Sequence, residues 1–376
     1  MMPGEGGQSI LFVPAMDTRK RTSERSPRLQ LVLAERYSVS PVERSAFSRK
    51  VYDPKVWRPF RYLLFPVDLA VVTVRTWRTA KRTEARLIFS EGTYFGLAAT
   101  VAAKLARTSA IWDNHGNIWG LGRTQRKGRL FVALNEALER WIARNATTMV
   151  VVSEDERLVY SSHGFEASRI KVFPTCVDLP NPISDRTMVR ERYGIPSSDK
   201  AVIFFGMLGY APNRNAAAFI AEKLAPEILR SDGTVRFLIA GGGEVPAKAE
   251  GVRFLGFVDD LDSLVVASDI CVAPVWEGVG ILTKVLDMLA SGRPTVVTPL
   301  ALTGIPELRS GDNCIVADDE KSFIDAVRKL AEDPDLADRI GRSGQRLVSE
   351  KYSWKAATPL LYAIVDEAMI KEEVRP

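Results

Sequence analysis

The chain has 376 residues, of which 46% are hydrophobic and 26% are charged. This length is about twice that of a typical domain, and the composition excludes disordered and fibrous classes. Residues 1–180 hold 28 Lys and Arg against 17 Asp and Glu, a net charge of +11, whereas the remainder holds 23 against 29, a net charge of −6. The basic first half predicts an anionic partner for that part of the chain.

Three cysteines, Cys176, Cys271 and Cys314, are too few and too scattered for a disulfide framework or a metal cluster. The first residues lack the basic segment and apolar run of a signal peptide. No stretch reaches the roughly 20 apolar residues that a membrane-spanning helix requires. We therefore expect a cytoplasmic protein, free or peripheral on the inner face of the membrane.

Strand-like and helix-like patterns alternate from the start of the chain, which favours parallel sheets with helices on both faces. The first series predicts strands at 9–14, 37–42, 86–90, 109–112, 149–153 and 170–174. Its helices are expected at 24–35, 69–82, 95–105 and 128–144. This half predicts a first Rossmann-like domain.

A second series repeats the alternation, with strands predicted at 201–205, 235–240, 252–255, 269–273 and 294–298. Its helices are expected at 215–229, 284–290, 320–332 and 335–350. The proline-containing stretch 178–200 is the predicted linker between the two series. The predicted fold class is therefore α/β, with two Rossmann-like domains at 1–178 and 199–351 that face each other across a cleft, and an additional helix at 352–376.

A glycine-containing loop follows the strand predicted at 269–273 and leads into a helix. Ligands of open α/β sheets collect at the carboxyl ends of strands, where loops meet helix N-termini. Gly278 and Gly280 let a ligand approach the backbone, and the free amides there favour a phosphate. Lys284, in the first helical turn, is placed to neutralise a diphosphate, and Asp287 to accept hydrogen bonds from a ribose. The alternative is a simple turn followed by a solvated Lys–Asp pair.

Five segments, in order, resemble the retaining glycosyltransferases of family 4, and the loop matches the Gly-rich subset of that family. They are MVVVSEDERLVYSSHGFEASRIKVFPTCVDLP (149–180), FFGMLGYAPNRNA (204–216), RFLIAGGG (236–243), FLGFVDDLDSLVVASDICVAP (254–274) and GVGILTKVLDMLASGRPTVVTPLALTGIPEL (278–308). The resemblance implies the GT-B fold, in which the C-terminal helix crosses back to the N-terminal domain. It also implies a nucleotide-sugar donor bound by the second domain.

The resemblance assigns roles to particular residues. Lys284 corresponds to the residue that neutralises the donor diphosphate, Asp287 to a ribose-binding carboxylate, and His115 to a histidine that reaches the donor sugar. The residues expected to bind the donor are Gly206, Met207, Phe257, Val258, Gly278, Val279, Gly280, Ile281 and Asp287, and those expected to act in catalysis are His115, Lys284 and Glu277.

Three features depart from the family pattern. Glu277 and Asp287 are ten positions apart, whereas many members carry two glutamates eight apart, and the second carboxylate is an aspartate. The arginine that often accompanies the lysine has no match in the loop after Gly206, and Arg214 is the candidate substitute.

Asp260 and Asp262 form an Asp-any-Asp pair, which we interpret as a helix cap, so no metal is expected.

Basic and acidic residues of the first half are candidates for the acceptor side. Arg49–Arg82 mixes cations with Trp and Tyr, a composition that suits an anionic membrane interface or a solvated basic face. Nucleic acid is not expected, because no reader motif accompanies the charge. The acceptor-side candidates are Arg19, Arg25, Arg28, Glu91 and Asp113.

The expected activity is transfer of a hexose from a UDP- or GDP-sugar to a hydroxyl acceptor, with retention at the anomeric carbon. The acceptor is expected to be a glycan, a lipid-linked sugar or a polysaccharide precursor, and no cofactor is expected. One alternative is a nucleotide-sugar epimerase of the same fold. Another is a sugar-nucleotide-binding subunit with weakened catalysis.

Overall fold

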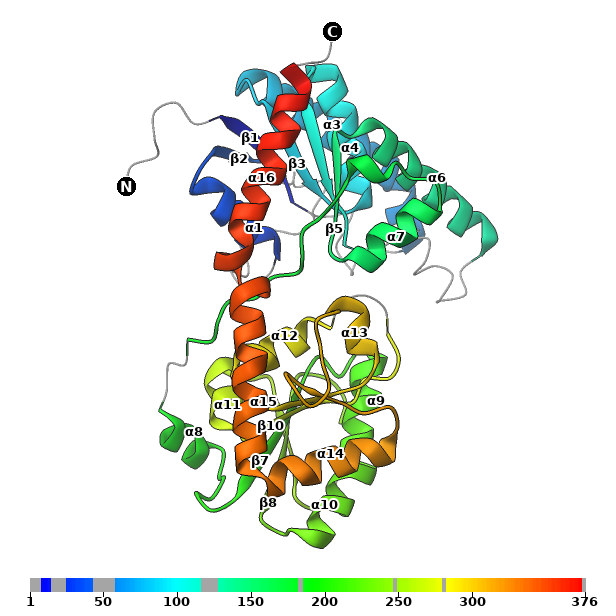
Figure 1. Ribbon diagram of the computed structural model, residues 1–376. Coiled ribbons are helices and arrows are strands. Elements are labelled where there is room, and N and C mark those ends of the chain that lie inside the picture. Colours follow the sequence, from blue (N-terminus) through cyan, green and yellow to red (C-terminus); the bar gives the residue numbers. More distant parts are fainter. Residues whose placement is uncertain are drawn as a thin grey trace. The chain divides into compact units, whose positions relative to one another are not determined.

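The computed structural model describes residues 8–14, 25–42, 58–115, 128–181, 185–245, 249–278 and 282–373. The chain divides into two compact units (Figure 1). The first comprises Met1–Pro174 with Thr358–Pro376, and the second comprises Thr175–Ala357. Each unit contains one six-stranded sheet, and every recorded strand pair is parallel. The expected pair of Rossmann-like α/β domains is thereby confirmed.

The first unit has the strand order β2-β1-β3-β4-β5-β6. Its strands are β1 (Ser9–Val13), β2 (Ser38–Pro41), β3 (Leu87–Glu91), β4 (Ser109–Asp113), β5 (Thr148–Val151) and β6 (Ile170–Val172). Its helices are α1 (Arg25–Ala34), α3 (Arg58–Arg82), α4 (Thr93–Ala106), α6 (Arg129–Asn145), α7 (Glu154–Ser162) and the short η1 (Ala167–Arg169). β3 and β4 are buried along their whole length, as expected for strands covered on both faces.

The second unit has the strand order β12-β11-β10-β7-β8-β9. Its strands are β7 (Lys200–Phe205), β8 (Val235–Ala240), β9 (Val252–Gly256), β10 (Ile270–Ala273), β11 (Thr295–Val297) and β12 (Ile315–Val316). Its helices are α8 (Arg186–Arg192), α9 (Ala211–Phe219), η2 (Ile220–Leu224), α10 (Ala225–Ser231), α11 (Leu261–Ala267), α12 (Thr283–Ala290), α13 (Leu300–Gly304), α14 (Glu320–Glu332), α15 (Pro334–Leu347) and η3 (Val348–Tyr352).

Helix α16 (Trp354–Glu373) starts in the second unit and ends in the first. In the first unit the Ser109 hydroxyl donates a hydrogen bond to the Ala368 carbonyl at 2.6 Å, and the Tyr37 hydroxyl donates one to Asp366 at 2.7 Å. Leu361 and Val365 are fully buried. These contacts confirm the expected return of the last helix to the N-terminal domain.

Several elements differ from the prediction, and β12, α7 and α13 were not predicted at all. Helix α3 begins at Arg58, eleven residues before the predicted start, and continues through Pro66, which interrupts the apolar pattern but not the helix. The stretch 178–200, predicted to be a linker, contains α8. Residues 49–57 of the basic stretch lie outside the described residues, and residues 58–82 form α3. None of the helices within the described ranges has the length and apolar character needed to cross a membrane.

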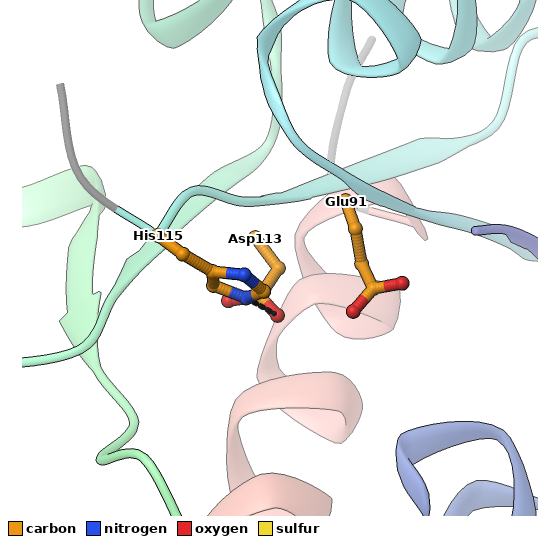
Figure 2. A group of neighbouring side chains, drawn as sticks. All are labelled: Glu91, Asp113 and His115. Atoms are coloured by element: carbon orange, nitrogen blue, oxygen red, sulfur yellow. Dashed lines mark hydrogen bonds and ion pairs between the residues drawn. The ribbon is translucent and has the colours of Figure 1, made fainter. Parts of the chain in front are cut away.

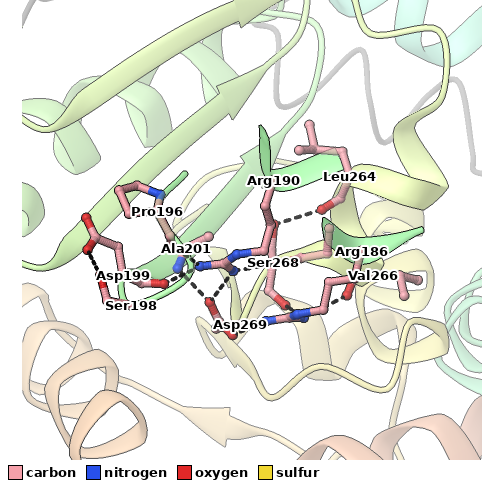
Figure 3. A network of polar contacts seen from close by, with 11 residues as sticks. Arg186, Arg190, Pro196, Ser198, Asp199, Ala201, Leu264, Val266, Ser268 and Asp269 are labelled. Atoms are coloured by element: carbon pink, nitrogen blue, oxygen red, sulfur yellow. Dashed lines mark hydrogen bonds and ion pairs between the residues drawn. The ribbon is translucent and has the colours of Figure 1, made fainter. Parts of the chain in front are cut away.

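Two arginines of α8 fasten this helix to the sheet of the second unit (Figure 3). Arg186 and Arg190 pair with opposite oxygens of Asp269 at 2.6 and 3.1 Å, and the same carboxylate accepts a hydrogen bond from the Ala201 amide at 2.8 Å. Arg190 also donates to the Pro196 carbonyl at 2.9 Å. A pocket of about 460 Å³ at the amino ends of β7 and β10 is lined in part by Arg186, Arg190, Pro196 and Asp269. Because both guanidiniums are used within the protein, we interpret this pocket as structural.

Candidate functional site

The sheet of the second unit reverses its strand order between β7 and β10. The carboxyl ends of these neighbouring strands lead into Gly206 and into the loop that begins at Pro274. Such a reversal is where open α/β sheets bind ligands, because the flanking loops turn away from each other and leave a crevice. The residues predicted to bind a diphosphate lie at this position.

Lys284, in the first turn of α12, is held at the end of β7. Its ammonium donates a hydrogen bond to the side-chain oxygen of Asn213 on α9. The same nitrogen lies 4.7 Å from the centre of the Phe204 ring, within the range of a cation–π contact. Burial lowers the pKa of Lys284 to about 8. An anion bound beside the ammonium would raise this pKa again and keep the side chain charged.

Gly206 lies directly beside this ammonium. A Cβ atom added to Gly206 would lie 2.6 Å from the Lys284 nitrogen and 2.8 Å from the Asn213 amide nitrogen, and its φ of +156° disfavours other residues. The neighbouring Gly241 is packed against the Gly206 carbonyl, which a Cβ would approach to 1.9 Å. Both positions therefore require glycine, because the backbone and the lysine occupy the space of a side chain.

The start of the loop after β10 is anchored by an aromatic cluster. Trp276 contacts Phe219 at 4.8 Å and Phe323 at 5.8 Å between ring centres. Glu277 is exposed, and its carboxylate makes no hydrogen bond or ion pair with a described residue. Gly278 has a φ of +157°. The predicted donor-binding residues Val279, Gly280 and Ile281 lie outside the described residues.

The remaining donor-side candidates line the carboxyl edge of the same sheet. Met207 follows Gly206 with a side chain that is 68% exposed, and its carbonyl accepts a hydrogen bond from Asn213 at 3.0 Å. Phe257 and Val258 follow β9, and the Phe257 ring is 75% exposed. The role of these three residues in donor binding stays a prediction.

Asp287 lies one turn beyond Lys284 on α12. Burial raises its pKa to about 7, and the carboxylates of Asp262 and Asp178 add to the rise. Near neutral pH this side chain is therefore both a hydrogen-bond donor and an acceptor. A ribose hydroxyl can be bound by either form.

Substituting Asp287 by Asn should remove a pH dependence of stability. Between its ordinary pKa of 3.8 and about 7, native Asp287 keeps a proton that the unfolded chain releases. The native state is therefore progressively penalised as the pH rises through this window. Asp287→Asn should raise the free energy of unfolding at pH 8 by on the order of 2 kcal/mol, and by less at pH 5.

Urea denaturation at the two pH values measures this effect. Asp325→Asn, which changes an exposed carboxylate on α14, is the matched control and should show little effect at either pH. Equal changes for Asp287→Asn at pH 5 and pH 8 would contradict the expected titration.

In the first unit, Glu91, Asp113 and His115 come together at the carboxyl ends of β3 and β4 (Figure 2). His115 binds the Asp113 carboxylate through Nε2 at 2.8 Å. Arg25 of α1 donates to both oxygens of that carboxylate at 3.1 Å, and to the Pro174 carbonyl at 2.9 Å. Arg25 is one of the predicted acceptor-side residues, and in the structure its guanidinium holds Asp113.

The pKa values of the two carboxyl groups of this cluster are shifted in opposite directions. Burial opposes the ionisation of Asp113, but Arg25 and His115 outweigh it and hold the pKa of that carboxyl below its usual range. Burial raises the pKa of Glu91, to which the Ser26 hydroxyl donates a hydrogen bond. Asp113 is thus the anion that orients His115, and no described residue bonds to the Nδ1 atom of the ring.

One ligand atom from each member of the cluster lies within 4.8 Å of the others, a spacing that suits a metal ion. Both oxygens of Asp113 and one oxygen of Glu91 already accept hydrogen bonds from Arg25 and Ser26. A cation here would also meet the guanidinium. We therefore assign the cluster a hydrogen-bonding role.

Four further residues singled out in the sequence complete the comparison. Arg19 lies outside the described residues, and Arg28 is half-buried on α1. Asp260 caps α11 as predicted, since its side chain accepts a hydrogen bond from the Ser263 amide at 3.1 Å. Arg214 is half-buried on α9, and its guanidinium has no partner among the described residues.

Sequence reasoning missed Asn213, the side chain that holds Lys284. Its segment, YAPNRN, has a proline and two asparagines, which is typical of a turn and carries no sign of a contact with a residue 71 positions away. Only the fold, which brings Asn213 of α9 to Lys284 of α12, reveals this contact.

Two family models match the chain. The model described as Glycosyltransferase Family 4 matches residues 23–180, and the one described as Glycosyl transferases group 1 matches residues 199–333. A curated relative, the alpha-D-kanosaminyltransferase of Streptomyces kanamyceticus, is 28% identical over 200 residues, which is 48% of this chain. The chain covers 49% of that relative, about half of its length.

Several solved structures have the same fold. Sucrose-phosphate synthase from Thermosynechococcus elongatus matches with a TM-score of 0.73 and 15% identity, over 97% of this chain and all of that chain. Anabaena Alr3699/HepE in complex with UDP matches with a TM-score of 0.69 and 16% identity, over 96% of this chain and all of that chain. A putative UDP-N-acetylglucosamine 2-epimerase from Listeria monocytogenes matches with a TM-score of 0.62 and 10% identity, over 97% of each chain.

Proposed function

Because two glycosyltransferase family models match the chain, we propose that it is a GT-B glycosyltransferase of family 4, which transfers a hexose from a UDP- or GDP-sugar to a hydroxyl group with retention of anomeric configuration. The proposed acceptor is a glycan, a lipid-linked sugar or a polysaccharide precursor. The proposed reaction uses no metal or cofactor.

The position of Lys284 carries the proposal. A half-buried ammonium lies at the strand-order reversal of the second sheet, beside the backbone of Gly206. A diphosphate is dianionic and needs both a cation and close backbone approach, and this site supplies both. The Anabaena protein, which has the same fold, was solved with UDP and with UDP-glucose, and this supports a nucleotide-sugar as the ligand.

In the proposed mechanism the acceptor hydroxyl attacks the anomeric carbon from the face that the nucleoside diphosphate leaves. The new bond joins the acceptor oxygen to that carbon, the bond to the diphosphate oxygen breaks, and the departing phosphate takes the hydroxyl proton. Lys284 and the amino end of α12 stabilise the negative charge on the leaving group. His115, oriented by Asp113, is assigned to the donor sugar by the family resemblance.

Donor binding can be tested without knowing the acceptor. A panel of UDP- and GDP-sugars is added to the protein, and thermal stabilisation and slow hydrolysis of the donor are followed. We expect at least one sugar nucleotide to stabilise the wild type. Lys284→Ala should weaken binding by about tenfold to a hundredfold, because a charge-assisted contact is lost. His115→Ala should keep binding and lose turnover.

The pH dependence provides a control within the same experiment. As the pH rises through about 8, Lys284 loses its proton in the free protein, so donor binding should weaken. In Lys284→Arg the cation persists, and binding should stay constant across this range. If no UDP- or GDP-sugar stabilises the wild type at any pH, the transferase proposal fails.

Two alternatives have the same fold. An epimerase would convert one sugar nucleotide into its epimer without an acceptor, and product analysis of the same incubations distinguishes it from slow hydrolysis. A binding subunit with weakened catalysis would show thermal stabilisation and no hydrolysis. Both family models name glycosyltransferases, which favours transfer over epimerisation.

A further inference from the structure

Helix α6 carries an apolar stripe on its solvent side. Leu130 and Leu134 are 72% and 60% exposed, and Trp141 is 39% exposed. With Ala137 they recur at intervals of four, three and four residues, so they lie on one face of the helix. A helix on the surface of a globular protein normally turns such a face inward. An exposed stripe of this kind marks a surface that contacts something else.

The opposite face of α6 is buried, and it carries two polar side chains beside the apolar Ile142 and Ala143. Glu139 is fully buried and accepts hydrogen bonds from the Thr93 and Tyr160 hydroxyls, both at 3.0 Å. Asn135 is buried and accepts one from the Tyr94 hydroxyl at 3.3 Å. Turning the apolar stripe inward would break these bonds and leave buried polar groups unsatisfied. The contacts from α4 and α7 therefore fix which face of α6 is presented to solvent.

Arginines border one side of this stripe. Arg129, Arg140 and Arg144 are spaced by eleven and four residues, so they share a face next to the leucines. Arg140 pairs with Glu136 at 3.0 Å, whereas Arg129 and Arg144 are exposed and have no side-chain partner among the described residues. Lys104 of α4 adds a further cation, 5.8 Å from the centre of the Trp141 ring.

From this arrangement we propose that α6 is a membrane-contacting surface, which lies flat on an anionic phospholipid bilayer. Leucine and tryptophan side chains enter the boundary between headgroups and acyl chains, and the two unpaired arginines bind lipid phosphates. Trp141 suits this position because its indole has both an apolar ring and a polar N–H. Contact through α6 involves no donor or acceptor, so it can be tested independently of transferase activity.

Site-specific fluorescence tests the contact in the full chain. The three native cysteines, Cys176, Cys271 and Cys314, are buried, so a cysteine introduced on the surface can be labelled selectively with an environment-sensitive dye. Dye at Leu134→Cys should brighten with vesicles of phosphatidylcholine and phosphatidylglycerol, and much less with phosphatidylcholine alone. Dye at Leu158→Cys, a 55% exposed leucine on the neighbouring α7, should not change.

Vesicle co-sedimentation measures the energetic contribution of the surface. Leu130→Glu with Leu134→Glu should weaken binding by about tenfold or more, because apolar burial is replaced by charge. Arg144→Gln should weaken it by about fivefold, and added salt should reduce that difference. Leu158→Glu is the matched control and should bind as the wild type does.

Two results would overturn the proposal. One is a wild type that does not bind anionic vesicles, or that binds them equally well after the double leucine substitution. The other is a wild type that sediments as a dimer and becomes a monomer after that substitution, since the stripe would then join two copies of the chain.

Discussion

Gly241→Ala is expected to lower the free energy of unfolding of the second unit by about 3 kcal/mol or more. The φ of Gly241 is +144°, and a Cβ there would lie 1.9 Å from the Gly206 carbonyl oxygen and 2.7 Å from its carbonyl carbon. Both clashing atoms are backbone, so no side-chain rotation can relieve the overlap. Relief requires the strand ends at Gly206 and Gly241 to separate, which moves the backbone beside Lys284.

The adjacent glycine supplies the control for this prediction. Gly242 is exposed, has no positive φ, and an added Cβ would have no neighbour within 4 Å. Gly242→Ala should therefore change stability by no more than about 0.5 kcal/mol. Calorimetric unfolding of both variants measures the difference, and donor-induced stabilisation reports on the lysine. Similar melting of the two variants would show that the close approach of the two strand ends is not needed.

Arg25→Met should destabilise the first unit by about 3–5 kcal/mol at neutral pH. The substitution leaves the buried, ionised Asp113 without its bidentate partner, whose side chain is 13% exposed. Asp113 has a depressed pKa, so its pairing stabilises the native state above the unfolded pKa of about 3.9, and that stability is lost as the pH falls through the native pKa. The gap between variant and wild type should therefore narrow in acid.

A spectroscopic readout separates positioning of His115 from general stability. With Asp113 ionised, the ring nitrogen that faces it must carry the hydrogen, so nitrogen NMR should show the Nε2–H form of His115. In Arg25→Met the Asp113 carboxylate is no longer held by the guanidinium, so its orientation of the ring is lost and the share of the Nε2–H form should fall. The chain has only one other histidine, His163, so His163→Gln completes the assignment.

A surface arginine is the control for this substitution. Arg36→Met removes a pair with Asp366 in which the side chains are 49% and 34% exposed, and should cost no more than about 1 kcal/mol. It should also leave the His115 spectrum unchanged. If Arg25→Met matches Arg36→Met in stability and keeps the Nε2–H form, Asp113 does not need Arg25.

The spacing of apolar residues and the positions of glycine and proline were enough to predict most of the fold. The alternation of strand-like and helix-like patterns placed most strands and helices of both sheets, although β12, α7 and α13 were not predicted. Several boundaries agree to within a residue, as for Val235–Ala240. Helix α3 was predicted too short because a proline at 66 weakens the local pattern, while tertiary packing on α4 keeps the helix intact. Local sequence cannot weigh these two effects.

The candidate site was predictable where its chemistry is local and not where it depends on distant partners. Lys284 could be located because a glycine loop and a helix start adjoin it in the chain. The partner of Arg25 is 88 positions away, so its charge alone suggested an external anion instead of Asp113. Likewise, the spacing within α6 predicts a helix, but its outward face is decided by hydroxyls on α4 and α7.

The route of α16 has a consequence for the order in which the chain folds during synthesis. Residues 175–357 form one contiguous unit, which can fold as soon as they have left the ribosome. The first unit is made earlier but still lacks Thr358–Pro376. In the complete unit Leu361, Val365 and Ala368 of this segment are buried, and the Ala368 carbonyl accepts a hydrogen bond from Ser109. The part that emerges first is therefore completed last, and until α16 has been made it exposes apolar surface that a chaperone can bind.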